Sequence, residues 1–397
     1  MSADARSLRV MALMICAEAL AMLGVSALAA TLPTLIAQWG LTSTQAGWLS
    51  GTFYLGYALA VPLLVSLTDR IDSRAIFFFG CVLGALAYLG FATAAHGLWT
   101  ATGLWAIAGV SLAGVYMPGL RIITARVVPA LRLRAVPYYT ASFGIGVSLS
   151  FFVAGTMAQA FGWRMAFATG ALGCVLAAGC CALATVGTVA HEAGAAGSGR
   201  FDLVRVVRNA AAVRFIVAYG GHCWELFAMR AWIVAFLLFA WNQSFGGNAG
   251  GRLTFWSTLA ALVGVPASIV GAEVALRIAR RRVVAIVATV SVLLALTTGW
   301  LGGVAFGLAV TALILYNAAI LGDSGALTTG VVDAAEPEVQ GATLALHSLV
   351  GFLGGALGPI AVGVVLGAFG GTASPFAWLA AFAVMGAGSL LALLAVR

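Results

Sequence analysis

Apolar stretches separated by short polar breaks follow one another along the entire chain. A helix crosses a membrane with about 20 mostly apolar residues, and these stretches reach or approach that length. The pattern predicts twelve membrane-spanning helices, near residues 8–33, 46–68, 75–94, 98–126, 136–160, 165–188, 212–240, 253–275, 283–299, 302–331, 341–367 and 374–396. Because the breaks are too short for a separate soluble domain, the expected fold class is an all-α integral membrane protein.

The composition supports this fold class and excludes several kinds of chemistry. Of the 397 residues, 62% are hydrophobic and only 8% are charged, whereas soluble proteins carry about 25% charged residues. All 20 basic residues are arginine, which excludes a lysine-dependent nucleotide site or Schiff base. The sequence also lacks a G-x-S-x-G nucleophile motif and metal-type cysteine spacing. We therefore expect no enzyme activity, no cofactor and no resident metal.

The arginines fall almost entirely on one side of the predicted topology. With a cytoplasmic amino terminus, only Arg164 and Arg252 lie in outer loops, while Arg121 and Arg230 lie inside spans. Cytoplasmic loops of membrane proteins are enriched in arginine and lysine. The pattern predicts a multi-pass monomer in the lipid bilayer of the cell (inner) membrane, with both termini cytoplasmic. It also accounts for the net charge of +8 without a nucleic-acid partner.

A polar stretch over residues 191–212 divides the chain into two halves of six spans, 1–190 and 213–397. The second part of this stretch, from Phe201 to Arg208, is amphipathic and basic. It is suited to a linker helix on the cytoplasmic membrane surface, with a solvated loop as the alternative.

The two halves repeat each other. The segment Cys16–Met22 of span 1 matches Cys223–Met229 of span 7 at its Cys, Glu, Ala and Met positions. Pro62 and Pro266, in spans 2 and 8, are each followed at the same interval by an acidic residue and then by arginines. Six-helix halves in the same orientation imply a two-fold axis along the membrane normal and a site near the midplane.

Three motifs carry a resemblance to a known family. They are Gly56-Tyr57 and Pro62 running into Asp69-Arg70 and Arg74, then Phe161-Gly162-Trp163-Arg164, and finally Gly354, Gly358 and Pro359. With its six plus six spans, the chain resembles the major facilitator superfamily of secondary transporters, although Val65 and Asp72 stand where the family's loop motif has glycine. The resemblance implies two pseudo-symmetric six-helix bundles and a central cavity lined by spans 1, 4, 7 and 10.

Ionisable residues inside a membrane helix are costly unless paired or hydrated, and each is a candidate functional residue. Glu18 and Glu225 occupy matching positions of the repeat, and the resemblance assigns them, with Arg121 and Asp323, to cavity-lining spans. Opposed carboxylates in a low-dielectric cavity can take up and release protons, and His222 lies one helical turn before Glu225. We expect proton coupling at Glu18, Glu225 and His222; the alternative is hydrogen bonding that only joins helices.

Five residues are expected to contact the substrate: Arg230, Arg121, Asp323, Tyr139 and His347. Arg230 lies about 140° around the helix from Glu225, so it either meets a partner on another span or binds an anionic group. Arg121 and Asp323 lie toward the cytoplasmic ends of spans 4 and 10, where gating or snorkelling is an equal alternative. Tyr139 and His347 correspond through spans 5 and 11.

Charged residues after spans 2 and 8 are expected to gate the cavity: Asp69, Arg70, Arg74 and Glu273. A carboxylate at an inner loop can accept hydrogen bonds from helix ends and arginines, and so latch the halves together when the cavity opens outward. Solvated loop charges are the alternative.

The leading hypothesis is a secondary active transporter that moves a small solute by alternating access and is coupled to protons. A second hypothesis is a transporter of divalent metals or organic cations that uses Glu18, Glu225 and His222. A receptor or channel is the third. Buried residues of both signs leave the charge of the substrate open, and the direction of transport is open as well.

Overall fold

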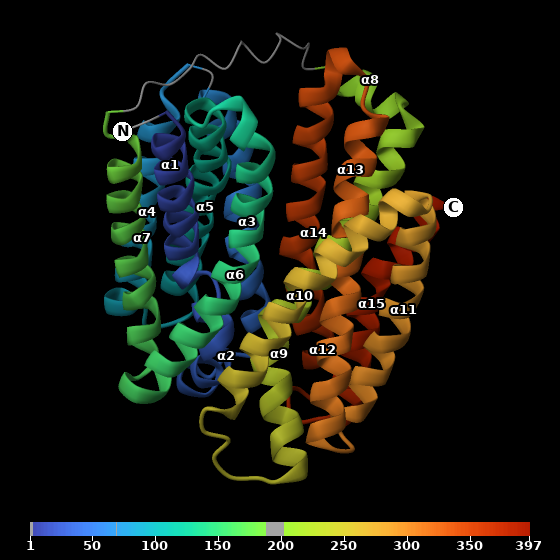
Figure 1. The fold of residues 1–397 in the computed structure, drawn as a ribbon. Helices are drawn as coiled ribbons and strands as arrows, with labels where there is room; N and C mark the ends of the chain where they lie inside the picture. The colour runs from blue at the N-terminus through green and yellow to red at the C-terminus, as the bar shows by residue number, and fades with distance from the viewer. Residues whose placement is uncertain (1–2, 69, 188–201) are drawn as a thin grey trace. The chain divides into compact units, whose positions relative to one another are not determined.

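The computed structural model describes residues 3–68, 70–187 and 202–397, and within these ranges it contains helices and no β-strand. Twelve helical segments are long and apolar enough to cross a membrane, which confirms the all-α fold and the predicted number of spans (Figure 1). Helices suit this environment because the bilayer core offers the backbone no hydrogen-bonding partners, so each segment satisfies its own.

The first six spans run from α1 to α7. Span 1 consists of α1 (Ala3–Ala21), the 3-10 turn η1 (Met22–Gly24) and α2 (Ala27–Trp39). The next five are α3 (Ser43–Leu67), α4 (Ser73–Ala94), α5 (Leu98–Arg126), α6 (Pro129–Phe161) and α7 (Trp163–Thr185). A turn of one residue, Gly162 with φ +88°, joins α6 to α7, and glycine adopts this left-handed conformation without steric cost.

The last six spans run from α9 to α15. They are α9 (Ala210–Ser244), α10 (Arg252–Arg277), α11 (Arg280–Leu301), α12 (Phe306–Gly322) with α13 (Ser324–Ala334), α14 (Gln340–Ala368) and α15 (Pro375–Val396). A 3-10 turn, η2 (Pro337–Val339), leads into α14, and the short helix α8 (Leu203–Arg208) precedes α9. The predicted linker helix is therefore helical over its described part.

Two spans are interrupted where the sequence pattern indicates continuous helices. Span 1 changes at η1, and span 10 breaks at Asp323, which lies between α12 and α13 with φ −100° and ψ −9°. Interrupted helices within a membrane protein occur where the freed backbone groups are enclosed by protein or line a cavity. Asp323 is thus the residue at which the helix of span 10 is interrupted.

Backbone contacts divide the chain into two compact units. The first comprises Met1–Ala27 and Gly56–Ser198, and the second comprises Leu28–Leu55 and Gly199–Arg397. By this division, α2 and the first half of α3 belong with the second unit. The sequence-based halves, 1–190 and 213–397 with a linker over 191–212, follow the internal repeat instead and stay a prediction.

Corresponding spans pack in the same pairs in the two six-span sets. In the first set α4 packs against α5 and α7, and α1 packs against α6 and α7. In the second set α11 packs against α12 and α15, and α9 packs against α14 and α15. Because these pairs follow the same order of spans, the fold carries the repeat that the sequence indicates, with α1 and α9 at equivalent positions.

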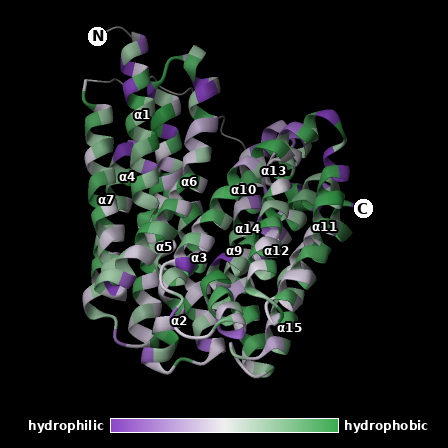
Figure 2. Cartoon of the chain, turned by 60° about the horizontal axis from the view of Figure 1, so that its bottom comes forward, coloured by the Kyte–Doolittle hydropathy of each residue, from purple (hydrophilic) through white to green (hydrophobic). Residues whose placement is uncertain are grey.

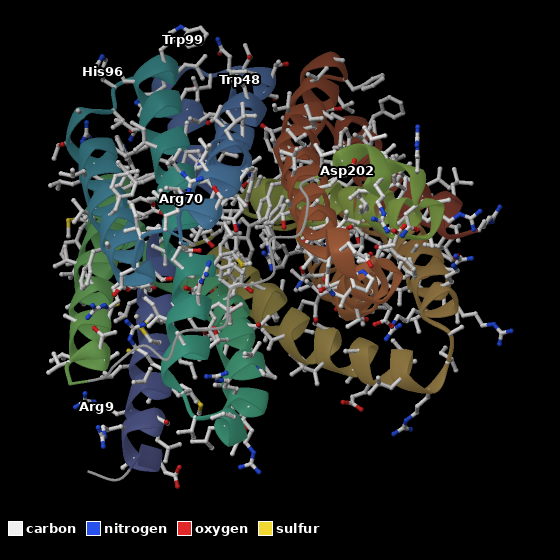
Figure 3. The ribbon with its side chains drawn as sticks, turned by 90° about the horizontal axis from the view of Figure 1, so that it is seen from above. Arg9, Trp48, Arg70, His96, Trp99 and Asp202 are labelled. Carbon is white, nitrogen blue, oxygen red and sulfur yellow. The ribbon has the colours of Figure 1, made fainter. Side chains whose placement is uncertain are left out.

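Apolar side chains cover the outer faces of the helices. Exposed large residues include Leu86, Leu183, Leu293 and Leu394, and hydrophobic colour dominates the helices in Figure 2. Within the first unit, Figure 3 draws His96 and the exposed Trp99 at the edge opposite Arg9. An apolar band bounded by tryptophan and arginine is typical of a protein that spans the bilayer.

Candidate functional site

Glu225 is buried in the middle of α9 and accepts hydrogen bonds from three hydroxyl groups. Ser291 of α11 and Tyr316 of α12 donate to its Oε1 at 3.0 Å and 2.7 Å. Ser389 of α15 donates to its Oε2. All four side chains are nearly inaccessible. The second unit therefore surrounds this acid with groups that can donate to a carboxylate or accept from a carboxylic acid.

Glu18 is fully buried in α1 and has one hydrogen-bond partner in the described part of the chain. The hydroxyl of Tyr139, from α6, donates to Glu18 Oε2 at 2.7 Å and lies 3.0 Å from the carbonyl of Tyr116 in α5. Glu18 Oε1 has no partner among the same residues. The close approach of Tyr139 to α5 depends on Gly119, because a Cβ there would lie 2.1 Å from the tyrosine oxygen.

His222 pairs with Asp323 rather than with Glu225. Its Nδ1 lies 2.8 Å from Asp323 Oδ1, and the two side chains are 3% and 4% exposed. Asp323 reaches His222 from the break in span 10. His347, on α14, stacks on Tyr219 with the ring centroids 3.8 Å apart, and Tyr219 also stacks on His222. Three predicted site residues thus come together between α9, α14 and the break in span 10.

Arg230 lies on α9 and is 9% exposed. Its guanidinium lies over Phe227, 5.9 Å from the ring centroid, and its Nε has no hydrogen-bond partner among the described residues. Phe227 in turn contacts Tyr54 of α3 and Phe352 of α14, at centroid separations of 4.2 Å and 5.7 Å. Among the described residues no acid of another span pairs with Arg230, and both roles expected from the sequence stay predictions.

Arg121 is half-buried in α5 and donates a hydrogen bond to the hydroxyl of Thr68, at the end of α3. Asp323 is fully buried and lies next to His222. The two residues, which sequence comparison assigns to similar places in spans 4 and 10, therefore have different surroundings.

The carboxylate that organises the loop after α3 is Asp72. It caps α4 through the backbone N–H of Arg74 at 2.9 Å, pairs with the Arg74 side chain at 2.8 Å, and lies 3.6 Å from Arg126. Partial burial alone would raise the pKa of Asp72, but hydrogen bonds from Arg74 and the charges of Arg74 and Arg126 outweigh this effect and lower the pKa below its ordinary value. Among the predicted gating residues, Asp69 lies outside the described residues, and Arg70 and Glu273 are exposed.

The inner ends of the second unit carry ion pairs that the sequence reasoning missed. Arg280, after α10, pairs with Asp333 near the end of α13. Arg205 of α8 pairs with Glu336 at 2.6 Å and with Glu338 at 3.2 Å. The positive-inside pattern detected the arginines, but nothing in the sequence indicated which acids they meet.

A family model of the Major Facilitator Superfamily matches residues 14–359, which is most of the chain. The chain belongs to the major facilitator superfamily. It is therefore a multi-pass membrane transporter of a small solute rather than an enzyme. Membership also agrees with the twelve spans and with the motifs on which the resemblance rests.

One protein of similar sequence is named as a transporter. The niacin transporter NiaP of Acinetobacter baylyi is 25% identical over 139 residues, which cover 35% of this chain and 31% of that protein. The chain thus aligns with about a third of that relative's length. The matched region is too short for its activity to be transferred to this chain directly.

Solved structures of superfamily members share the fold over nearly the whole chain. A bacterial homologue of the human lysosomal transporter Spinster, in an inward-facing and occupied conformation, gives a TM-score of 0.77 at 15% identity and covers 98% of this chain and 94% of its own. The nucleoside transporter NupG gives 0.73 at 14% identity, covering 98% of each chain. The xylose transporter XylE from E. coli gives 0.72 at 12% identity, covering 98% and 97%.

The metal hypothesis gains no support from the arrangement of the side chains. Over residues 3–68, 70–187 and 202–397, no three His, Cys, Asp or Glu residues come together in a way that could hold an ion. Glu225 and His222, which this hypothesis joins, instead bind hydroxyl groups and Asp323 respectively.

Proposed function

We propose that this superfamily member is a proton-coupled secondary transporter that moves a small organic solute by alternating access of its two six-span halves. The observation that carries the proposal is a pair of buried glutamates, Glu18 and Glu225, at matching positions of the repeat and each bonded to hydroxyl groups. A carboxylate inside a membrane protein is costly when it is charged. A conformational change that alters its surroundings therefore changes how readily it holds a proton, which is the property that coupling needs.

Glu18 and Tyr139 can exchange the roles of donor and acceptor. When Glu18 is ionised, the tyrosine hydroxyl donates to the carboxylate. When Glu18 is protonated, the acid donates to the tyrosine oxygen, and the tyrosine proton turns to the carbonyl of Tyr116. Because both protonation states are hydrogen-bonded, neither leaves the tyrosine hydroxyl without a partner.

Glu225 has a comparable freedom with more partners. The hydroxyls of Ser291, Tyr316 and Ser389 can each rotate from donating to accepting, so the set can adjust when the carboxylate gains a proton. We propose His222 with Asp323 as a further proton site, because the two groups share a buried hydrogen bond and each can carry a proton.

The remaining predicted residues are assigned as follows. We propose Arg230 as the main substrate contact, with Arg121, Asp323, Tyr139 and His347 supporting or shaping the site. We propose that the loop residues Asp69, Arg70, Arg74 and Glu273 take part in gating, and that Asp72 and Arg126 complete the latch on the first half.

We further propose that the protein is a monomer of the inner membrane with both termini in the cytoplasm. The arginine distribution supports this orientation, and the even number of spans is consistent with termini on the same side. The relative named for niacin supports testing small organic acids first.

The test is uptake into liposomes that hold the purified full-length protein and an imposed pH gradient. Nicotinate and a panel of small organic acids serve as solutes. Uptake by the wild type should rise with the gradient, whereas Glu225→Gln and Glu18→Gln should lose that rise because an amide cannot carry the proton. The control is Glu338→Gln, which changes an exposed glutamate of the turn before α14. An unchanged response to the gradient in both variants would contradict a role of Glu18 and Glu225 in proton coupling.

A further inference from the structure

The arginine at position 230 is a buried cation without an acidic partner in the described part of the chain. Its side chain is enclosed by α9 and its neighbours, and its Nε makes no hydrogen bond there. The side chains that act on it electrostatically are the phenol of Tyr54 and the thiol of Cys223. Arginines inside membrane spans ordinarily meet an acid, a backbone carbonyl or water. The surroundings of Arg230 are those of a group whose anionic partner comes from outside the protein.

One aromatic ring lies beside the same guanidinium, and two further rings pack on that ring. Phe227 lies one turn before Arg230 on α9, and it packs at a low tilt against Tyr54 and Phe352, with interplanar angles of 32° and 27°. Gly355 of α14 fixes the ring of Phe227, because a Cβ at that position would lie 2.4 Å from Phe227 Cδ2. Tyr54 is only half-buried, so part of its ring is accessible in addition to the contact with Phe227.

We infer that Arg230, Phe227 and Tyr54 recognise a planar aromatic carboxylate as the transported substrate. The inference rests on the proposed transport function and names the substrate class of that function. A guanidinium binds a carboxylate through two parallel N–H···O hydrogen bonds. The ring of the substrate stacks against the aromatic side chains that flank the arginine.

Other anions match this arrangement less well. Phosphate and sulfate would satisfy the guanidinium but would make no use of the aromatic rings beside it. An aliphatic carboxylate would bury apolar surface but would forgo ring stacking. Movement of an aromatic carboxylate together with one proton carries no net charge, so the buried acids and Arg230 act on the same transport cycle without competing for one ligand.

Equilibrium binding to the purified full-length protein tests this assignment. Benzoate is the probe, benzamide lacks its charge, and cyclohexanecarboxylate lacks its aromatic ring. Isothermal titration should show that benzoate binds about tenfold or more tightly than either analogue, since each analogue loses one of the two recognition elements. Equal affinities for benzoate and benzamide would overturn the role of Arg230, and equal affinities for benzoate and cyclohexanecarboxylate would overturn that of the rings.

Two variants assign the effects to residues. Arg230→Gln should weaken benzoate binding at least about 30-fold, as expected for loss of one partner of a buried charged hydrogen-bonded pair. Phe227→Leu keeps an apolar side chain and should bring the benzoate to cyclohexanecarboxylate ratio close to one. This ratio is informative even if Arg230→Gln fails to fold. An unchanged ratio in Phe227→Leu would contradict the proposal.

The matched control is Arg252→Gln. Arg252 also lies over an aromatic ring, that of Trp241 at 5.0 Å, but it is exposed at the start of α10. Its loss should leave benzoate affinity unchanged, and an equal loss in both arginine variants would show a general effect of charge and overturn the assignment. Binding needs no gradient, so the two proposals fail separately. Benzoate binding through Arg230 without pH-driven uptake overturns the coupling, and pH-driven uptake of another solute without benzoate binding overturns this substrate class.

Discussion

The two six-span halves carry a glutamate at the same position of the repeat but bind it differently. Within the described residues, Glu18 has a single hydroxyl partner, Tyr139 of span 5. Glu225 has three, which come from spans 9, 10 and 12. The repeat has therefore kept the acid and changed its surroundings. A carboxylate with one donor depends wholly on that donor, whereas a carboxylate with three tolerates the loss of any one.

The residue that matches the partner of Glu18 does not bind Glu225. Tyr139 corresponds to His347 in the repeat, yet His347 stacks on Tyr219 and makes no bond to Glu225. His222, which lies one turn before Glu225 on α9, contacts Asp323. The matching position of span 1 holds Ile15. The second half thus contains a buried histidine–aspartate pair at a position where the first half has an isoleucine.

The largest expected effect is a loss of stability when the buried pair of His222 and Asp323 is disrupted. Asp323→Ala leaves His222 buried without its carboxylate, and removal of one partner of a buried pair costs about 3 kcal/mol or more. The free energy of unfolding in detergent should fall accordingly. Adding His222→Phe to the same chain should recover part of the loss, because no unpaired polar group then remains. A loss no greater than that of an exposed substitution such as Asp333→Ala would contradict a structural pair.

The sequence predicted the fold better than it predicted the site. Twelve spans follow from the lengths of apolar stretches, and the repeat follows from matched residues such as Glu18 and Glu225. These features are local or periodic, so a linear pattern records them. The partners of Glu225 are serines and a tyrosine, which are common in membrane helices, and only the packing of α9 against three other helices brings them to the acid.

Other parts of the site depended on backbone features that composition does not reveal. Asp323 was expected within a continuous span, but it interrupts span 10 and so turns toward His222. Asp72 was noted only as a departure from the family's glycine, yet it is the residue that caps α4 and pairs with Arg74. The aromatic surroundings of Arg230 combine α3, α9 and α14, whose residues are far apart along the chain.

A second prediction disturbs the one partner that Glu18 has. Gly119→Ala places a Cβ 2.1 Å from the hydroxyl oxygen of Tyr139, so the tyrosine must move away from α5. Overpacking of this kind costs about 1–3 kcal/mol. Thermal unfolding measures the loss, and Gly103→Ala is the control on the same helix. Gly103 has no neighbouring atom within 4 Å of an added Cβ, so alanine there should stabilise α5 slightly. Equal stability of the two variants would show that Tyr139 is not held against α5.

A third prediction compares the two acids directly through their tyrosines. Tyr139→Phe removes the one hydroxyl that the described residues place on Glu18, whereas Tyr316→Phe leaves Ser291 and Ser389 on Glu225. The stimulation of uptake by a pH gradient should fall about tenfold in Tyr139→Phe, the effect of losing roughly 1.4 kcal/mol, and less than threefold in Tyr316→Phe. Liposome uptake at matched protein density measures both. If Tyr316→Phe is the more damaging change, the number of donors does not decide how robust each acid is.

The smallest expected effect tests the inner loops, where the two halves reverse the signs of their charges. In the first half Asp72, from the loop after span 2, faces Arg126 at the end of span 4. In the second half the loop after span 8 supplies Arg280, and the end of span 10 supplies Asp333. Asp72→Asn retains a side chain that can cap α4, so it removes the charge with little change in the helix terminus.

The lowered pKa of Asp72 fixes the sign of the pH dependence. A carboxyl group whose pKa is lower in the folded state contributes its stability above the unfolded value of about 3.9 and loses it as the pH falls through the folded value. Because Asp72 is exposed to solvent, we expect wild type to exceed Asp72→Asn by less than about 1 kcal/mol at pH 7. The difference should shrink as the pH falls below about 3.9 and should vanish once the pH lies below the folded value. Thermal unfolding of both proteins across this range measures it. A difference that persists undiminished at the acidic end would mean that the side chain stabilises α4 by packing or capping, and that the charge reversal between the halves contributes nothing to stability.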